Sequence, residues 1–176
     1  ISHHHVNQPL KLVSKSLSET DDLVDEIRCG GYDIQTILAQ IKGDLIMVRG
    51  NHDEVLEKYL NSGNFMQDRK NMYVALDLAQ ALLEGQDVLK YAYEKYAELP
   101  EEVLDRIQWL QRDQTYKIGD VECGQHGDMG ANGSKGSLLS LEKAYGNCVV
   151  GHTHSAAIMR GVYRVGTMSK LVLEYN

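Results

Sequence analysis

Gly151-His152-Thr153-His154 and Gly50-Asn51-His52-Asp53 are the two stretches of sequence that decide the fold. Each follows a short apolar run, Cys148-Val149-Val150 before the first and Leu45-Ile46-Met47-Val48 before the second. Short apolar runs that end in polar turns are typical of buried strands. Open α/β sheets build their ligand sites at the carboxyl ends of such strands. The two runs therefore predict an α/β fold whose site lies where these strands end.

A further histidine, His126, lies in a third turn, which is flanked by glycines. Together with Asn51, His152 and His154 it offers imidazole nitrogens and an amide oxygen as candidate metal ligands. This donor set suits Mn, Zn or Fe better than Ca or Mg. Two divalent metals held close together clamp a phosphoryl oxygen and activate water. The pattern therefore predicts metal-dependent hydrolysis of a phosphoester.

Three residues beside Asn51 are candidates for the chemistry itself. His52 is the candidate proton donor to the departing alkoxide. Asp53 is expected to fix the tautomer of His52 and to raise its basicity. Arg49 is a candidate contact to the substrate phosphate, and a surface position at the strand end is the alternative. The turn could also cap the helix that follows it.

Composition places the chain among soluble globular proteins. Its 176 residues, 43% hydrophobic and 24% charged, predict one domain over residues 1–176. A net charge of −7 argues against a surface devoted to phosphate backbones, although a metal site would supply local positive charge. Three cysteines without C-x-x-C spacing predict reduced thiols and a cytoplasmic protein. No apolar run approaches the ~20 residues that span a bilayer, so no membrane partner is expected, while homo-oligomerisation stays open.

Helices are predicted for most of the first two-thirds of the chain. The segment 18–21 is expected to begin a helix that Gly30-Gly31 ends, with a second short helix over residues 33–40. The turn at Asn51 leads into a helix that ends at about Asn61.

Residues 62–114 have an almost wholly helical pattern and are interpreted as a helical insertion. Its last helix is predicted to open at Pro100 and to continue through Leu110. Tyr91, Tyr93 and Tyr96 could stack on bases, but their helical spacing favours packing.

The last third switches to short strands. A hairpin is predicted over residues 116–123 because of its Gly-Asp turn. A helix is predicted over residues 134–145, and Cys148 is expected to be a buried core residue. Further strands are predicted over residues 156–159, 162–165 and 170–174.

The order of the motifs resembles that of the calcineurin-like metallophosphoesterases. That family carries Asp-x-His, Gly-Asp-x-x-Asp, Gly-Asn-His-Asp/Glu, a histidine after a strand, and Gly-His-x-His. The last three stand here as Gly50-Asn51-His52-Asp53, His126 and Gly151-His152-Thr153-His154. The resemblance implies an α/β fold with a two-sheet β-sandwich flanked by helices. It also implies two divalent metal ions, Mn first, with Zn, Fe or Mg as alternatives.

The resemblance assigns a role to each residue of these motifs. Asn51, His126 and His152 would bind one metal, and His154 would bind the other. His52 would be the catalytic acid and would contact the phosphate.

Phage and prophage members of the family give the most detailed likeness. The two N-terminal motifs, which would supply the bridging carboxylate, do not occur after Ile1. Ser2-His3-His4-His5 matches the segment that follows Gly-Asp-x-x-Asp in those members. We therefore expect the chain to begin just past the bridging aspartate and to be incomplete at both ends. His4 is predicted to face the substrate, and a tag remnant or direct metal ligation are the alternatives.

The same likeness suggests the substrate. This subgroup includes a pre-early phage nuclease, so the leading hypothesis is a nuclease that cleaves DNA phosphodiester bonds in the host cytoplasm. A phosphomonoesterase acting on a nucleotide or a phosphoprotein is the rival. A non-catalytic scaffold that retains the fold is the third reading, because the bridging carboxylate is missing.

Overall fold

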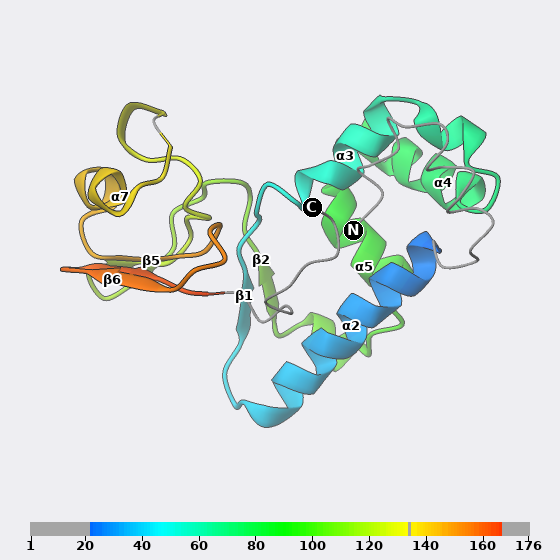
Figure 1. Cartoon of the computed structure of the whole chain (residues 1–176). Helices are drawn as coiled ribbons and strands as arrows, with labels where there is room; N and C mark the ends of the chain where they lie inside the picture. The colour runs from blue at the N-terminus through cyan, green and yellow to red at the C-terminus, as the bar shows by residue number, and fades with distance from the viewer. Residues whose placement is uncertain (1–21, 134, 167–176) are drawn as a thin grey trace. The chain divides into compact units, whose positions relative to one another are not determined.

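The structure of the protein is a computed structural model that describes residues 22–133 and 135–166 (Figure 1). The chain divides into two compact units, one comprising Ile1–Met47 and His52–Trp109 and the other Val48–Asn51 and Leu110–Asn176. Helices make up most of the first unit and a mixed sheet most of the second, so the predicted α/β class is confirmed. Within the described ranges, no helix is both long and apolar enough to cross a membrane.

The first unit begins with the long helix α2 (Leu23–Gln40). Asp22 caps it, because its carboxylate accepts hydrogen bonds from the backbone N–H groups of Val24 and Asp25. The backbone N–H of Leu23 donates to Asn71 Oδ1 at 2.8 Å, which ties the start of the helix to a distant loop. The helix start predicted at residues 18–21 lies outside the described residues.

The prediction that Gly30-Gly31 ends this helix was wrong. Helix α2 continues through both glycines, and α5 (Val88–Tyr96) crosses it there. A Cβ at Gly30 would lie 2.3 Å from the Tyr93 hydroxyl oxygen, and one at Gly31 would lie 2.9 Å from the Cβ of Ala97. The glycines therefore serve close packing between helices rather than helix termination.

The remaining helices of this unit surround a shared apolar core. They are α3 (Glu54–Asn61), η2 (Asn64–Gln67), α4 (Met72–Leu83) and α6 (Glu101–Leu104). Leu56, Leu78 and Val88 lie in this core with no exposed surface. Tyr93 packs as its helical spacing predicts, because its ring centroid lies 5.3 Å from that of Trp109.

A polar cluster joins helices α4 and α5. The carboxylate of Asp77 accepts hydrogen bonds from Lys95 Nζ at 2.6 Å and from the Tyr96 hydroxyl at 2.8 Å. Tyr91 adds a longer hydrogen bond to the same carboxylate. One carboxylate thus satisfies three donors on α5 and fixes the crossing of the two helices.

The last helix of the predicted insertion is shorter than expected. Helix α6 ends at Leu104, and residues 107–109 form strand β2 (Ile107–Trp109) instead of continuing the helix. This strand pairs in parallel with β1 (Leu45–Met47), with Leu45 opposite Ile107. The helical spacing of apolar residues was misleading because parallel pairing with β1 decides the local conformation.

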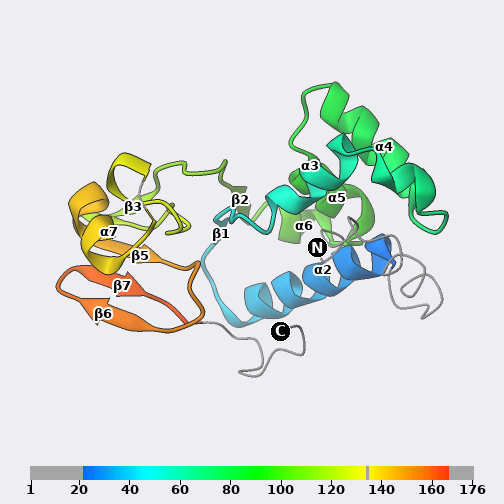
Figure 2. The ribbon, with the colours of Figure 1, turned by 45° about the horizontal axis from the view of Figure 1, so that its top comes forward.

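The second unit is built on a five-stranded mixed sheet in the order β3-β4-β5-β7-β6 (Figure 2). Its strands are β3 (Lys117–Ile118), β4 (Val121–Glu122), β5 (Cys148–Val150), β6 (Ala157–Met159) and β7 (Val162–Arg164). The antiparallel pairing of β3 with β4 confirms the hairpin predicted over residues 116–123. The strands predicted over residues 156–159 and 162–165 are also confirmed.

Helix α7 (Leu138–Tyr145) packs on this sheet after the short helix η3 (Ala131–Gly133). Leu141 of α7 contributes to a core with Cys148, Val150 and Val162 of the strands. Cys148 is fully buried, as expected. The strand predicted over residues 170–174 lies outside the described residues. The described strands form two sheets, and their packing face to face as a sandwich stays a prediction.

Candidate metal centre

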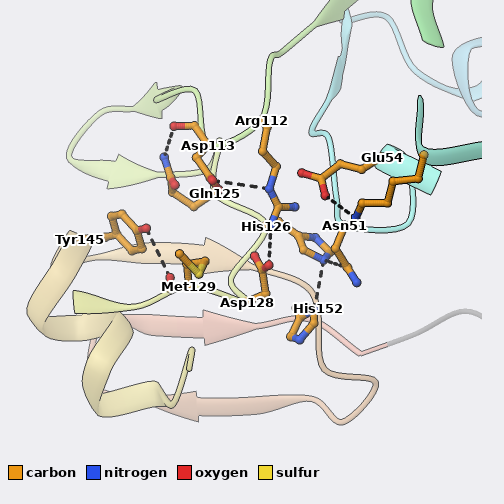
Figure 3. A network of polar contacts seen from close by, with 11 residues as sticks. Asn51, Glu54, Arg112, Asp113, Gln125, His126, Asp128, Met129, Tyr145 and His152 are labelled. Carbon is orange, nitrogen blue, oxygen red and sulfur yellow. Dashed lines mark hydrogen bonds and ion pairs between the residues drawn. The ribbon is translucent and has the colours of Figure 1, made fainter. Parts of the chain in front are cut away.

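Three side chains from distant segments of the chain converge in the second unit (Figure 3). Asn51 Oδ1 lies 2.7 Å from His126 Nε2, and His152 Nδ1 lies 3.2 Å from the same nitrogen. The two imidazole rings stand edge to face, with centroids 5.1 Å apart. These residues follow strands β1, β4 and β5, so the predicted convergence of Asn51, His126 and His152 is observed within one unit.

Backbone features bring these turns together. The N–H of Gly151 donates to the carbonyl oxygen of His126 at 2.9 Å, which joins two histidine-bearing turns directly. Gly127 has a φ of 98°, a conformation that L side chains rarely adopt, and a Cβ there would lie 2.7 Å from the Cβ of Val150. A Cβ at Gly50 would lie 2.8 Å from Cε1 of His126. The glycines of both motifs therefore make room for the cluster.

The donor atoms fit a single divalent cation. Asn51 Oδ1 has no hydrogen to donate, so the proton of its hydrogen bond belongs to His126 Nε2. That nitrogen also lies 3.2 Å from His152 Nδ1. Once His126 Nε2 gives up its proton, each of the three atoms can offer an electron pair to a cation. Two nitrogen ligands about 2.1 Å from one ion lie roughly 3.0–3.4 Å apart at angles of about 90–110°. The observed nitrogen separation of 3.2 Å falls in this range.

The donor set is neutral and small. Across residues 22–133 and 135–166, no group of three or more His, Cys, Asp or Glu side chains is arranged to hold a metal ion. The cluster itself consists of two imidazoles and one amide, which suits Zn, Mn or Fe. What it lacks is a carboxylate, the ligand that would bridge two ions.

The other residues expected at the site are placed less closely. His154 is exposed and has no hydrogen bond or ring contact with the cluster within the described ranges. Arg49 is only 8% exposed, and its Nη1 donates to Gln111 Oε1 at 3.3 Å. Its alternative reading as a surface residue was therefore wrong, while contact with a substrate stays a prediction. His4 lies outside the described residues.

His52 and Asp53 belong to the first unit, because the boundary between the units falls after Asn51. The imidazole of His52 is exposed, and its carbonyl oxygen accepts a hydrogen bond from Val55 N. Asp53 stands at the N-cap of α3 but its side chain makes no capping hydrogen bond. Capping therefore does not explain Asp53, and the acid role of His52 stays a prediction.

An ion pair that the motifs did not reveal lies next to His126. Arg112 Nη2 bonds Asp128 Oδ2, and both side chains are only 20% exposed. Burial raises the pKa of Asp128, but the hydrogen bond and charge of Arg112 outweigh it, so that the pKa is lowered below its ordinary value. Arg112 carried no sequence signal, because it sits in a polar stretch without motif spacing.

Known proteins provide independent evidence. A family model described as calcineurin-like phosphoesterase matches residues 21–156, which include the three converging side chains. The chain is 32% identical over 187 residues to "Protein A1" of Escherichia phage T5. That match covers 99% of this chain but 32% of the phage protein, so the chain spans about a third of this relative's length. No solved structure matches the chain.

Proposed function

The chain belongs to the calcineurin-like phosphoesterase family, and we propose that it is a metal-dependent phosphoester hydrolase. The observation that carries this proposal is the convergence of Asn51, His126 and His152 from three separate segments onto one point. Asn51 Oδ1 and His152 Nδ1 both lie within 3.2 Å of His126 Nε2, a spacing that suits ligands of one shared cation. The family match gives that ligand its identity as a divalent cation.

We assign the metal ligands as follows. Asn51, His126 and His152 would hold one ion, and His154 would contribute to a second ion together with carboxylates that the cluster lacks. Mn is the first choice, with Zn, Fe or Mg as alternatives. Bound divalent cations in such a centre polarise the phosphoryl oxygen and lower the pKa of water.

The chain's own residues would then bind the substrate and transfer a proton. His52 would donate a proton to the oxygen of the leaving alkoxide as the bond between that oxygen and phosphorus breaks. Asp53, the next residue, would orient the imidazole. Arg49 and His4 would contact the phosphate. In this proposal the whole chain forms one domain, with its two sheets packed as a sandwich and residues 62–114 as an insertion.

DNA is the substrate that we favour, because the relative, "Protein A1" of Escherichia phage T5, is a phage protein. A phage nuclease of this kind would work in the host cytoplasm. A phosphomonoester is the second candidate, and the net charge of −7 favours it, since an acidic surface repels a DNA backbone. A non-catalytic scaffold is the third reading, which the absence of a carboxylate from the cluster favours.

Hydrolysis assays on matched variants test the proposal. We expect the protein, in a form that also carries the Asp-x-His and Gly-Asp-x-x-Asp motifs, to release nitrophenol from bis-p-nitrophenyl phosphate with Mn²⁺ and to nick supercoiled DNA. His152→Ala and Asn51→Ala should reduce both rates to background, because each removes a ligand. Asn147→Ala, an exposed asparagine of the same unit, is the control and should keep the parent rate.

Three outcomes separate the candidates. Full activity in His152→Ala would refute the assigned centre. Turnover of p-nitrophenyl phosphate without any diester cleavage would replace the nuclease by a phosphomonoesterase. An inactive parent that also retains no metal in elemental analysis would leave the scaffold reading.

A further inference from the structure

A four-residue turn in the second unit contacts the segments that carry two of the three donors. This turn, Gln111-Arg112-Asp113-Gln114, is closed by a hydrogen bond from Gln114 N to Gln111 O at 3.1 Å. The Gln114 side chain accepts a second bond from Gln111 N at 2.8 Å. Asp113 has a φ of 56°, in the left-handed region. We call these residues the 111–114 turn.

The turn first contacts the segment that leads to Asn51. Gln111 Oε1 accepts a hydrogen bond from Arg49 Nη1 at 3.3 Å, and Arg49 stands two residues before Asn51. Arg49 is only 8% exposed whereas Gln111 is exposed, so this contact is partly shielded from water. The position of the Asn51 turn is therefore coupled to Gln111.

The turn also contacts the chain on both sides of His126. Before it, Gln125 Nε2 donates to the carbonyl oxygen of Asp113 at 3.2 Å, and Gln125 is 5% exposed. After it, Arg112 pairs with Asp128 (Figure 3). His126 is thus fixed between two side chains that are both anchored on the same turn.

These contacts are of the kind that hold a site rigid. Polar groups shielded from water interact more strongly with one another, and removing one partner leaves the other without its hydrogen bond. Because different residues of the turn contact the Asn51 segment and the His126 segment, a displaced turn would alter the placement of both donors relative to each other. The 2.7 Å separation between Asn51 Oδ1 and His126 Nε2 therefore depends on the turn.

We propose that the 111–114 turn is a positioning element of the metal centre, with Gln111 setting Asn51 and Arg112 setting His126. The positioning of the two side chains can be tested without metal. Its consequence for metal affinity rests on the proposed function.

Histidine-ring and amide NMR spectra of the metal-free chain test the positioning directly. Arg112→Met should shift the ring resonances of His126 and His152, since it releases Asp128. Gln111→Leu should instead shift the side-chain amide of Asn51.

Two further variants provide the controls. Arg160→Met is the matched control, because Arg160 pairs with Glu142 elsewhere in the same unit and is 73% exposed. It should leave the ring resonances of both histidines in place. Arg112→Lys, which keeps the charge facing Asp128, should restore most of the parent spectrum.

Titration with Zn²⁺, followed in the same spectra, tests the consequence. Residues that orient ligands typically change metal affinity about 10- to 100-fold, so the Zn²⁺ dissociation constant should rise by that factor in Arg112→Met and Gln111→Leu. It should change by less than about twofold in Arg160→Met, because exposed ion pairs contribute little.

The outcomes distinguish this proposal from the proposed function. Unshifted resonances of His126 in Arg112→Met and of Asn51 in Gln111→Leu would overturn the positioning role. Shifted resonances in a parent chain that binds no Zn²⁺ would support the positioning role and contradict the metal centre. If Arg112→Met does not fold, Gln111→Leu and Arg112→Lys decide the question.

Discussion

Gly127, the residue after His126, offers a sharp test of how the site is packed. It combines two features, a φ of 98° and a position where a Cβ would lie 2.7 Å from Cβ and 3.1 Å from Cγ2 of Val150. Val150 belongs to the core of the second unit and is 2% exposed, so it has little room to move. Alanine at position 127 should therefore cost stability for two independent reasons.

The two costs can be estimated separately. Holding a residue other than glycine in a rarely adopted backbone region costs about 1–3 kcal/mol. Overpacking a well-packed core costs a further 1–3 kcal/mol or so. Gly146 isolates the first cost, because its φ is 70° and a Cβ there would meet no atom within 4 Å. The loss of unfolding free energy should therefore be about 1–3 kcal/mol larger in Gly127→Ala than in Gly146→Ala, and this difference is the overpacking cost.

Urea unfolding of both variants, followed by circular dichroism, measures the difference. Both glycines belong to the second unit, so the two substitutions report on the same cooperative structure. Equal loss of unfolding free energy in the two variants would show that Val150 does not confine position 127. The packing argument for the His126 turn would then be wrong.

Two other perturbations have expected outcomes. Gly50→Ala should displace the ring of His126 by about 0.7 Å, because the new Cβ needs an ordinary carbon contact distance. This displacement should lower kcat/KM with Mn²⁺ at least about tenfold. An unchanged rate would contradict the placement of Gly50 against this ring. Asp77 should make stability depend on acid pH. Its burial raises the pKa, but the hydrogen bonds from Lys95 and Tyr96 outweigh this and leave the pKa below its ordinary value. A lowered folded-state pKa contributes stability that is present above the unfolded-state value of about 4 and is lost as pH falls through the folded value. The stability difference between the parent and Asp77→Asn, measured by thermal unfolding, should therefore shrink below pH ~4. A difference that stays constant as the pH falls further would refute this role of Asp77.

The strands that carry the candidate ligands were predictable because their signal is local. The apolar runs at residues 45–48 and 148–150 are bounded by polar turns, and both form strands at those positions. The hairpin over residues 116–123 followed in the same way from its Gly-Asp turn. In each case the neighbouring residues alone favour the observed structure.

Structure that depends on distant partners was predicted less well. Gly30-Gly31 looks like a helix end, yet it lies inside α2 where α5 approaches too closely for side chains. Ile107 fits the helical spacing of the preceding residues, yet it pairs with Leu45 in a parallel ladder. The 111–114 turn has no local signal at all, because its role arises from contacts with residues 49, 125 and 128. Sequence patterns report periodicity and turns, and they do not report which segments meet.

Backbone strain gives a further reason to regard the cluster as functional. Among the described residues, those other than glycine with a positive φ are Glu98, Asp113, His152 and Arg160. Arg160 lies in the tight turn between β6 and β7 and Glu98 follows the end of α5, and positive φ is ordinary in both contexts. Asp113 is the third residue of the 111–114 turn, and a positive φ is ordinary at that position as well. His152 lies between Gly151 and Thr153, and the N–H of Thr153 donates to the carbonyl oxygen of Gly151 at 2.9 Å. A positive φ at the centre of so tight a turn is rare and strained.

The strained residue therefore belongs to the site. His152, with a φ of 65°, is itself one of the three donors. Such a conformation costs about 1–3 kcal/mol and persists where surrounding contacts enforce it. Here one such contact is the hydrogen bond from the N–H of Gly151 to the carbonyl oxygen of His126 at 2.9 Å. The fold thus gives up stability at a residue that sets the distance between the donors, which is expected if that distance serves to bind an ion.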